Sequence, residues 1–273
     1  MKLIKTAEGL LLSNAENFDL AQTLDCGQAF RWCCDGNGYW HGIVDGVALK
    51  LRQDKSGILF CGVNEADFKN KWARYFDLER NYGEIITAIS ENEVLQKASS
   101  LCAGIRILRQ EPFETLCSFI ISQNNNIPRI KGIIERLCTG FGEKRGEFYA
   151  FPTPGALACL TPEDLAPIRS GFRARYIIDA AKKCASGEID FAEIEKMPLD
   201  AAREKLMTIC GVGIKVADCA LLFGFGKTDA FPKDVWIKRA LDTLFDGELP
   251  KCALPYAGIV QQYIYHYART AGL

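Results

Sequence analysis

The stretch that most constrains this chain is Gly211-Val212-Gly213, which lies between two helical patterns. Residues 203–210 place Arg203, Leu206 and Cys210 at helical spacing, and the apolar run over 216–223 has the composition of a second helix. Glycine tolerates positive φ and close backbone approach, so it can end one helix and allow the next to begin at once. The sequence therefore predicts a helix-hairpin-helix.

The start of the second helix is a predicted anion site. The first amides of a helix have no partner inside it, and they carry the positive end of the helix dipole. A phosphate group of a nucleic acid fits such a position. The hairpin is therefore predicted to hold a nucleic-acid backbone.

Two charged residues next to this hairpin are candidates for chemistry. Lys215 lies in the first turn of the second helix, where the dipole disfavours an ammonium, so its amine is a candidate nucleophile. Asp234 precedes Val235-Trp236 and is predicted to be the N-cap of the following helix, with a carboxylate that could also face a reaction centre. Taken singly, Lys215 could be a solvated surface charge and Asp234 a plain cap.

Residues 211–219 together with Asp234 strongly resemble the 8-oxoguanine DNA glycosylase/AP lyases of the helix-hairpin-helix-GPD superfamily, and the resemblance covers nearly the whole chain. It implies that Lys215 is the nucleophile that forms a Schiff base and Asp234 the catalytic carboxylate. It also implies phosphate contacts at Gly211, Gly213 and Val216. The family has proline where Cys210 stands.

The resemblance implies an α+β fold. We expect a small N-terminal antiparallel β-sheet domain with covering helices over residues 1–112. Residues 113–273 would form the mostly α-helical helix-hairpin-helix-GPD glycosylase domain, with the active-site cleft between helical subdomains.

Independently of the resemblance, the sequence pattern of residues 1–63 predicts β structure. Three tight turns, at residues 35–38, 45–46 and 54–57, separate short strands rich in β-branched and aromatic residues. This pattern predicts an antiparallel meander, and helices beginning near Asp67-Phe68 are expected to cover one of its faces.

Gly27 precedes the first of these strands within Cys26-Gly27-Gln28-Ala29-Phe30-Arg31-Trp32. Taken alone, Gly27 is interpreted as a glycine in a turn. The segment resembles the family's Gly-Gln-x-Phe-Arg-Trp motif, which implies that the Gly27 carbonyl accepts a hydrogen bond from N7–H of 8-oxoguanine. Guanine has an acceptor at N7, so the same carbonyl would reject it, and an unpaired buried polar group costs about 1–3 kcal/mol.

From residue 64 onward the chain reads as helical. We expect a helix that opens at Glu111-Pro112-Phe113 and ends near Gln123, a second one after Pro128, and a start at Thr161-Pro162-Glu163-Asp164. Further helices are expected over 176–184 and 198–206, and a last one that contains residues 255–266.

The asparagines between the first two of these helices could be plain capping residues. The segment also resembles the family's base-flipping loop, which fills the space that an extruded base leaves. The resemblance implies that Asn124 fills the gap, that Phe172 is a wedge, and that Arg129 and Arg173 grip the estranged cytosine. The family commonly has tyrosine where Phe172 stands.

The lesion base would meet three further side chains by resemblance. Gln261 would contact its Watson–Crick edge, Tyr265 would stack on one face where the family commonly has phenylalanine, and Cys219 would pack on the other. Stacking on an aromatic ring is worth about 1–3 kcal/mol per base. The hairpin carbonyls of relatives hold a monovalent cation, and Met207, Ile209 and Val212 match those positions.

Composition limits the other possibilities. The net charge is −1, which argues mildly against a coat-like or non-specific binder of nucleic acid but not against a local basic cleft. The twelve cysteines are dispersed, with Cys102, Cys117, Cys138, Cys159 and Cys184 each inside an apolar segment, so we expect reduced, buried thiols. No tight four-cysteine cluster lies near the carboxyl end, which argues against the superfamily's iron–sulfur branches, and two histidines make a zinc site unfavourable.

The sequence thus predicts a bifunctional enzyme that excises 8-oxoguanine paired with cytosine, by base flipping, Schiff-base formation at Lys215 and β-elimination. We expect no cofactor, a monomer acting on double-stranded DNA, no membrane association, and a prokaryotic cytoplasm, with the enzyme reaching the nucleoid through DNA. Two alternatives stay open: a monofunctional alkylbase glycosylase, which needs the aspartate alone, and a non-catalytic helix-hairpin-helix DNA-binding module.

Overall fold

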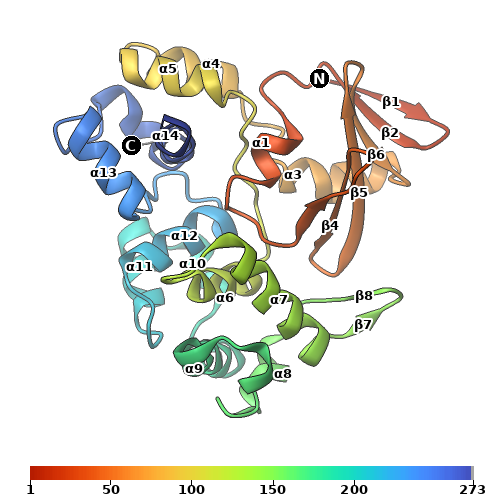
Figure 1. Ribbon diagram of the computed structural model, residues 1–273, viewed down its shortest axis with the longest axis vertical. Helices are drawn as coiled ribbons and strands as arrows, with labels where there is room; N and C mark the ends of the chain where they lie inside the picture. Colours follow the sequence, from red (N-terminus) through yellow and green to blue (C-terminus); the bar gives the residue numbers. More distant parts are fainter. Residues whose placement is uncertain (272–273) are drawn as a thin grey trace. The chain divides into compact units, whose positions relative to one another are not determined.

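A computed structural model describes residues 1–271, and its chain divides into two units (Figure 1). The first unit consists of Met1–Gly42, Leu49–Arg109 and the described residues from Thr228 on. The second consists of Ile43–Ala48 and Gln110–Lys227. Each unit is therefore built from segments that are separated along the chain.

The sheet follows the predicted meander and adds a hairpin in front of it. Within residues 1–271 it has six strands in the order β1-β2-β6-β5-β4-β3. Antiparallel registers pair Leu10 with Phe60 and Leu51 with Phe60. The strands are β1 (Lys2–Thr6), β2 (Gly9–Ser13), β3 (Trp32–Cys34), β4 (Tyr39–Val44), β5 (Val47–Asp54) and β6 (Gly57–Cys61).

One face of the sheet is buried under aromatic side chains. Alternate residues of β2 and β5 are buried, as a half-covered antiparallel sheet requires. Phe60 from the sheet meets Phe68 and Phe76 edge-on, with ring centroids 5.0 and 5.6 Å apart. The helical segment that begins near Asp67 therefore covers the sheet, as predicted from its aromatic spacing.

The helices of the first unit come from both ends of the chain. They are α1 (Leu20–Leu24), α2 (Glu65–Asp67), the π-helical η1 (Phe68–Trp72), α3 (Ala73–Tyr75), α4 (Tyr82–Ile89), α5 (Glu93–Leu101), α13 (Val235–Leu244), the 3₁₀ helix η4 (Lys251–Tyr256) and α14 (Ala257–Ala271). α14 packs against α5 and α13.

The second unit is almost entirely helical. Its elements are α6 (Pro112–Ser122), α7 (Ile127–Phe141), the short strands β7 (Lys144–Arg145) and β8 (Phe148–Tyr149), α8 (Pro154–Ala158), the 3₁₀ helices η2 (Ala166–Ile168) and η3 (Gly171–Arg173), α9 (Ala174–Ala185), α10 (Phe191–Lys196), α11 (Leu199–Met207) and α12 (Ile214–Phe225). α12 packs against α6 and α11, and α9 against α8.

One predicted helix start was wrong. Thr161 and Asp164 do form the reciprocal capping contacts: the Thr161 amide donates to Asp164 Oδ2 at 2.8 Å, and the Asp164 amide donates to Thr161 Oγ1 at 3.4 Å. These contacts close a turn, and only the short η2 follows. Arg169, at the end of η2, has φ +59°, so the backbone leaves the helical region before an α-helix can form.

Other expectations need smaller corrections. The β1–β2 hairpin and α10 were not predicted, and α14 begins at Ala257 because residues 251–256 form a 3₁₀ helix. All twelve cysteines lie in the described part of the chain as free thiols. Cys102, Cys117 and Cys138 are buried as predicted, whereas Cys159 is exposed and Cys184 half-buried. Burial raises the pKa of Cys102 to about 12, so that thiol behaves as a small apolar group.

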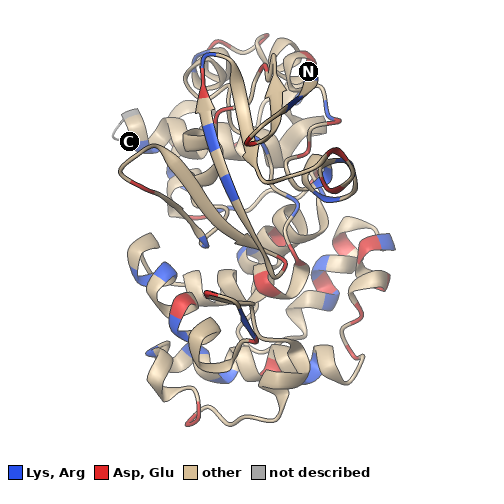
Figure 2. Ribbon diagram, turned by 90° about the vertical axis from the view of Figure 1, so that its right-hand side faces the viewer, with Lys and Arg blue, Asp and Glu red and all other residues tan. Residues whose placement is uncertain are grey.

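The predicted fold class is confirmed, since an antiparallel sheet precedes a mostly helical chain. The expected domain boundary after residue 112 stays a prediction. Basic and acidic positions are both dispersed over the chain (Figure 2), in keeping with the net charge of −1. Within residues 1–271, no helix has the length and apolar character needed to cross a bilayer.

Candidate active site

The glycine hairpin has the predicted geometry. α11 ends at Met207 and α12 begins at Ile214, and Gly211 between them has φ +76°. Gly213 is the N-cap of α12, with an extended backbone and, within the described chain, no side-chain hydrogen bond to the first turn. The first amide paired by the helix itself belongs to Ala217, which donates to the Gly213 carbonyl at 3.0 Å. The amides before it, including that of Val216, precede the first hydrogen bond of the helix, and the anion site expected there stays a prediction.

A salt bridge holds the two helices of the hairpin together. Arg203 of α11 donates from Nε to Asp218 Oδ1 of α12 at 2.6 Å, and the Asp218 side chain is buried. Burial lowers the pKa of Arg203, but the hydrogen bonds and negative charges of Asp218 and Asp200 together outweigh this effect, so the pKa is raised. The guanidinium therefore stays charged opposite its buried partner.

Lys215 is the second residue of α12 and is half-buried. Its ammonium nitrogen lies 5.1 Å from the centre of the Phe119 ring of α6. Within its own unit, as far as residue 227, no salt bridge holds that ammonium. Within this unit, the amine is thus oriented by an aromatic face rather than neutralised by a carboxylate.

Cys219 follows Lys215 by one turn of α12 and is buried. Val216, between them, is buried as well, so its side chain anchors the helix while its amide lies in the first turn. The predicted contact of Cys219 with a base stays a prediction.

The asparagine turn lies between α6 and α7. Asn124 is exposed and has φ +48°, and Asn126 caps α7 by accepting from the Arg129 amide at 3.0 Å. The predicted capping role therefore belongs to Asn126. Asn124 holds a left-handed backbone conformation that asparagine tolerates better than most residues.

Arg173 is placed differently from the other predicted base contacts. The Arg173 residue is 3% exposed, and its guanidinium donates to the carbonyls of Gln123, Asn124 and Ser170, the last two at 3.0 and 3.1 Å. Arg173 thus fixes the backbone of the asparagine turn in this structure. Its predicted contact with cytosine would require those hydrogen bonds to be exchanged.

The other two side chains of this group are exposed. Phe172 is 52% exposed, with its ring 5.8 Å from that of Tyr176, while Arg129 is exposed at the start of α7. Both are accessible to a ligand, as the predicted wedge and cytosine contacts require.

Asp234 lies in the first unit and is the N-cap of α13, as predicted. Its Oδ1 accepts from the Ile237 amide at 2.8 Å, and its residue is half-buried. Tyr265 of α14 is electrostatically coupled to it: burial raises the pKa of Tyr265, Arg269 opposes this, and the Asp234 carboxylate adds to the rise. The phenol is therefore neutral beside this carboxylate.

Gly27 lies in the loop between α1 and β3 with φ +86°. Gln28 next to it is almost fully buried and holds the loop, because its Nε2 donates to the carbonyls of Thr23 and Arg106 at 2.9 and 2.8 Å. Its Oε1 accepts from the Leu108 amide at 2.9 Å. This side chain fixes the backbone at the predicted lesion-recognition carbonyl.

Gln261 is buried in α14, and its Oε1 accepts from Gln262 Nε2 at 2.8 Å. This hydrogen bond restrains the orientation of the Gln261 side-chain amide. The predicted contact with a base edge stays a prediction.

The predicted cation position has a suitable set of donors. Met207, Ile209 and Val212 would contribute neutral backbone oxygens, which are donors that hard cations accept. The Ile209 carbonyl already accepts from the Val212 amide at 3.0 Å, and its second lone pair would serve a cation.

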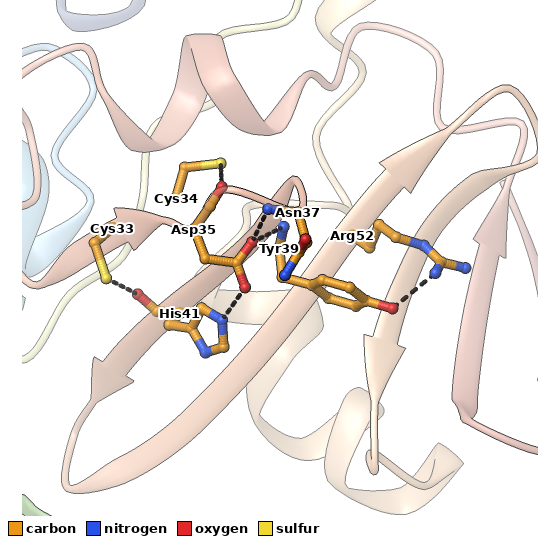
Figure 3. Close-up of polar contacts among 7 residues, drawn as sticks. All are labelled: Cys33, Cys34, Asp35, Asn37, Tyr39, His41 and Arg52. Atoms are coloured by element: carbon orange, nitrogen blue, oxygen red, sulfur yellow. Dashed lines mark hydrogen bonds and ion pairs between the residues drawn. The ribbon is translucent and has the colours of Figure 1, made fainter.

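A separate polar cluster organises the β3–β4 turn (Figure 3). Asp35 Oδ1 accepts from the amides of Asn37 and Tyr39, both at 2.9 Å, and Oδ2 lies 3.0 Å from His41 Nε2. Hydrogen bonding to His41 and to the turn amides lowers the pKa of Asp35. Arg52 donates to the Tyr39 hydroxyl at 2.7 Å. These contacts explain why the predicted hairpin turn forms here.

Sequence reasoning missed residues whose role depends on distant partners. Phe119 was given no role, and Gln28 was interpreted only as part of a motif. The pair Asp179 and Lys183 carries a sequence signal, since the two are four apart in a helix, but their hairpin partners lie more than 20 residues away.

A helix-hairpin-helix with a lysine in the first turn of its second helix, and an aspartate capping a later helix, defines the base-excising class of DNA glycosylases. Family comparisons place the chain more narrowly. Residues 10–116 match the 8-oxoguanine DNA glycosylase N-terminal domain, and residues 117–248 match the HhH-GPD superfamily base excision DNA repair protein.

Individual relatives and a solved structure support the same family assignment. An N-glycosylase/DNA lyase of Saccharomyces cerevisiae is 34% identical, over 85% of this chain and 69% of the yeast protein. A probable N-glycosylase/DNA lyase of Methanothermobacter thermautotrophicus is 32% identical, over 85% of this chain and 86% of the relative. The solved structure of Clostridium acetobutylicum 8-oxoguanine glycosylase/lyase, in complex with double-stranded DNA that has cytosine opposite 8-oxoguanine, superposes with a TM-score of 0.92 at 36% identity, covering 100% of this chain and 99% of that one. The chain belongs to the 8-oxoguanine DNA glycosylase family of the HhH-GPD superfamily.

Proposed function

We propose that this chain is a bifunctional DNA N-glycosylase/AP lyase that removes 8-oxoguanine paired with cytosine. The observation that carries the proposal is Lys215 in the first turn of α12, with its amine oriented by Phe119 and unpaired with any carboxylate of its own described unit. Whole-length similarity to glycosylase/lyases supports it and does not favour the two alternatives.

The reaction proceeds in two steps at the deoxyribose. Lys215 first loses a proton, and its neutral amine attacks C1′ of the extruded nucleotide. The bond from C1′ to the base breaks, and the electron pair leaves with the base, which takes up a proton. Ring opening of the sugar gives a Schiff base. Loss of a proton from C2′ then expels the 3′ phosphate, so the strand is nicked without a metal or other cofactor.

Asp234 acts on the charge that this reaction develops. Its carboxylate, fixed as the cap of α13, stabilises positive charge on the sugar and helps to hold the amine. Lys215 and Asp234 belong to different units, so the proposal requires the DNA-bound enzyme to bring both to the same sugar.

The lesion is read by one backbone carbonyl and three side chains. The Gly27 carbonyl, held by Gln28, accepts from N7–H of 8-oxoguanine and repels N7 of guanine. Gln261 donates to the Watson–Crick edge of the flipped base, Tyr265 stacks on one face, and Cys219 packs on the other.

The opposite strand is held by the asparagine turn. Asn124 fills the vacated stack, and the exposed Phe172 wedges beside it. Arg129 donates to the estranged cytosine, and Arg173 joins it after exchanging its carbonyl partners for the base. Two cationic donors suit the N3 and O2 acceptors of cytosine, which explains a preference for that base.

The hairpin holds the phosphate backbone through the amides near Gly211, Gly213 and Val216. A monovalent cation, held by the carbonyls of Met207, Ile209 and Val212, would add positive charge at the same place. Binding is therefore expected to weaken with salt despite the near-zero net charge. We further propose a monomer that acts in a prokaryotic cytoplasm, and light scattering of the purified chain would test the monomer.

Borohydride trapping tests the proposal directly. Wild type and Lys205→Gln, a matched lysine change in the preceding helix, are expected to give a covalent adduct with a duplex that carries 8-oxoguanine opposite cytosine, in the presence of EDTA. Lys215→Gln is expected to give none. A folded wild type that binds the duplex and leaves an intact abasic site without an adduct would favour the monofunctional alternative. Binding without any excision would favour the DNA-binding module.

A second duplex, with adenine opposite 8-oxoguanine, tests the expected preference for cytosine as the opposite base. We expect excision to be at least about 10-fold faster opposite cytosine than opposite adenine, because each good pairing of a side chain with a base contributes about 1–3 kcal/mol of discrimination. Equal rates would remove the assigned roles of Arg129 and Arg173.

A further inference from the structure

The hairpin backbone is held from outside by one helix of its own unit. The Cys210 amide donates to Asp179 Oδ2 of α9 at 2.7 Å. The Thr208 carbonyl accepts from Lys183 Nζ of α9 at 2.5 Å. A donor and an acceptor two residues apart in the hairpin are thus bound by two oppositely charged side chains of the same helix.

A third residue of α9 fixes the next position of the hairpin. The ring of Tyr176 lies against Gly211, and a Cβ added to that glycine would come within 2.4 Å of the ring. Tyr176, Asp179 and Lys183 are spaced by three and four residues, so they lie on one face of α9. This face contacts residues 208, 210 and 211 in turn.

An ordinary surface salt bridge does not account for this arrangement. Lys183 Nζ and Asp179 Oδ2 are 3.8 Å apart, farther than either group is from its hairpin partner. Glu188, at 3.4 Å, is also closer to Lys183 than Asp179 is. The shortest contacts of both side chains are therefore those with the backbone that leads to Gly213 and Lys215.

We propose that Asp179 and Lys183 are positioning residues for DNA binding and Schiff-base formation. They fix the turn from which the phosphate-binding amides and Lys215 project, and neither touches the substrate. The inference rests on the proposed function, in that the hairpin must bind a DNA phosphate for its positioning to affect catalysis.

The charge of Asp179 allows a positioning role to be distinguished from a purely electrostatic one. A carboxylate near a phosphate-binding hairpin repels DNA, so its removal should by electrostatics alone tighten binding. Positioning predicts the opposite, because the Cys210 amide loses its acceptor and the turn loosens. The sign of the change in affinity therefore separates the two explanations.

The experiment measures the dissociation constant for a duplex that contains a tetrahydrofuran abasic-site analogue, together with the borohydride trapping rate on 8-oxoguanine. Asp179→Ala is expected to weaken binding about 10-fold and to slow trapping, as loss of a charge-assisted hydrogen bond implies. Asp179→Asn removes the charge but keeps an acceptor, so it should stay within about 3-fold of wild type. Circular dichroism fixes a temperature at which every variant is folded.

Lys183 has a matched control on the same helix. Lys183→Met and Lys182→Met remove the same charge, but Lys182 is exposed and makes no hairpin contact within the described chain. We expect Lys183→Met to weaken binding and slow trapping several-fold more than Lys182→Met. Equal effects would reduce Lys183 to a general electrostatic contribution and overturn its positioning role.

A double-mutant cycle isolates the contact of Asp179 with the hairpin. Cys210→Pro removes the amide proton that Asp179 binds, so adding Asp179→Ala to that variant should change the dissociation constant by less than about 2-fold. Additive effects of the two changes, or tighter binding by Asp179→Ala alone, would overturn the inference. If Cys210→Pro does not fold, the comparison of Asp179→Ala with Asp179→Asn decides.

Amide hydrogen exchange, measured without DNA, tests the positioning of the hairpin independently of the proposed enzymatic function. The Cys210 amide is expected to be protected in wild type and Asp179→Asn and to exchange faster in Asp179→Ala. That result would stand even if wild type gave no covalent adduct, in which case the proposed function alone would fail. An adduct from wild type with unchanged binding and exchange in Asp179→Ala would defeat the positioning inference alone.

Discussion

The ammonium nitrogen of Lys215 lies 5.1 Å from the centre of the Phe119 ring, and that ring is stacked on Phe223 with the two centroids 5.4 Å apart. Phe223 lies on α12 two turns beyond Lys215, so α6 supplies one ring that packs against both ends of this helix segment. An aromatic face attracts an ammonium by about 0.5–2 kcal/mol, depending on desolvation. The ring therefore favours one direction for the proposed nucleophile.

Phe119→Leu keeps an apolar side chain but removes that face. We expect the borohydride trapping rate to fall about 3- to 10-fold, because the amine spends less time oriented toward the sugar. Phe113→Leu is the control, since Phe113 is buried in the same helix but its ring partner is Phe151. A similar loss of rate in both variants would show that general loosening of α6, rather than the ring beside Lys215, is responsible.

Arg203→Ala tests the salt bridge between the two hairpin helices. The change leaves the buried Asp218 carboxylate without its 2.6 Å partner, and removal of one member of a buried pair costs about 3–5 kcal/mol. We expect the free energy of unfolding, measured with urea, to fall by about 3 kcal/mol. Asp200→Ala removes the exposed second partner of Arg203 and should cost less than about 1 kcal/mol. If both variants lowered the free energy of unfolding equally, the exposed contact with Asp200, rather than the buried contact with Asp218, would account for the stabilisation.

His266 predicts a pH dependence of stability. Burial of its ring, and secondarily the nearby Arg269, lower its pKa below the ordinary value of about 6.5. As the pH falls below that value, the unfolded chain takes up a proton that the folded chain does not, so stability is lost with decreasing pH. Urea unfolding at pH 7.5 and 5.5 should show a smaller loss in His266→Gln than in wild type. An identical loss would assign the pH dependence to other groups.

Local rules predicted the parts of the site that depend on their own backbone. The glycine hairpin, the cap at Asp234 and the turn at residues 35–38 formed as expected, because a glycine with positive φ or a capping carboxylate acts within a few residues of the chain. The same rules failed at Thr161, where the capping contacts formed but the backbone turned left-handed at Arg169 before a helix could follow.

Contacts between distant segments could not be predicted in this way. Arg173 was assigned to cytosine by its place in a motif, yet in this structure its Nε and Nη2 donate to carbonyls some 50 residues away in sequence. Asp179 is 31 residues from the amide that it binds. Spacing within a helix shows which side chains share a face, but only the packed structure shows what that face meets.

The two hairpin glycines differ in a way that separates folding from DNA contact. Gly211 has φ +76° and lies against the Tyr176 ring, whereas Gly213 has φ −98° and nothing within 4 Å of an added Cβ. Gly211→Ala must adopt a strained backbone and displace the ring, so we expect it to lower the free energy of unfolding by more than about 2 kcal/mol. Gly213→Ala should cost at most about 1 kcal/mol, since alanine is only a poorer N-cap than glycine.

For DNA affinity we expect the opposite order, with a larger effect of a substitution at Gly213 than of one at Gly211. The Cβ of Gly213→Ala would occupy the space from which a phosphate approaches the first amides of α12, so we expect this variant, although nearly as stable as wild type, to bind an abasic-analogue duplex at least about 10-fold more weakly. Gly213→Ser, which adds a capping hydroxyl to the same obstruction, should be more stable than Gly213→Ala and bind no better. Wild-type affinity in both Gly213 variants would mean that DNA does not approach the hairpin at this residue, and the phosphate contacts would have to be reassigned.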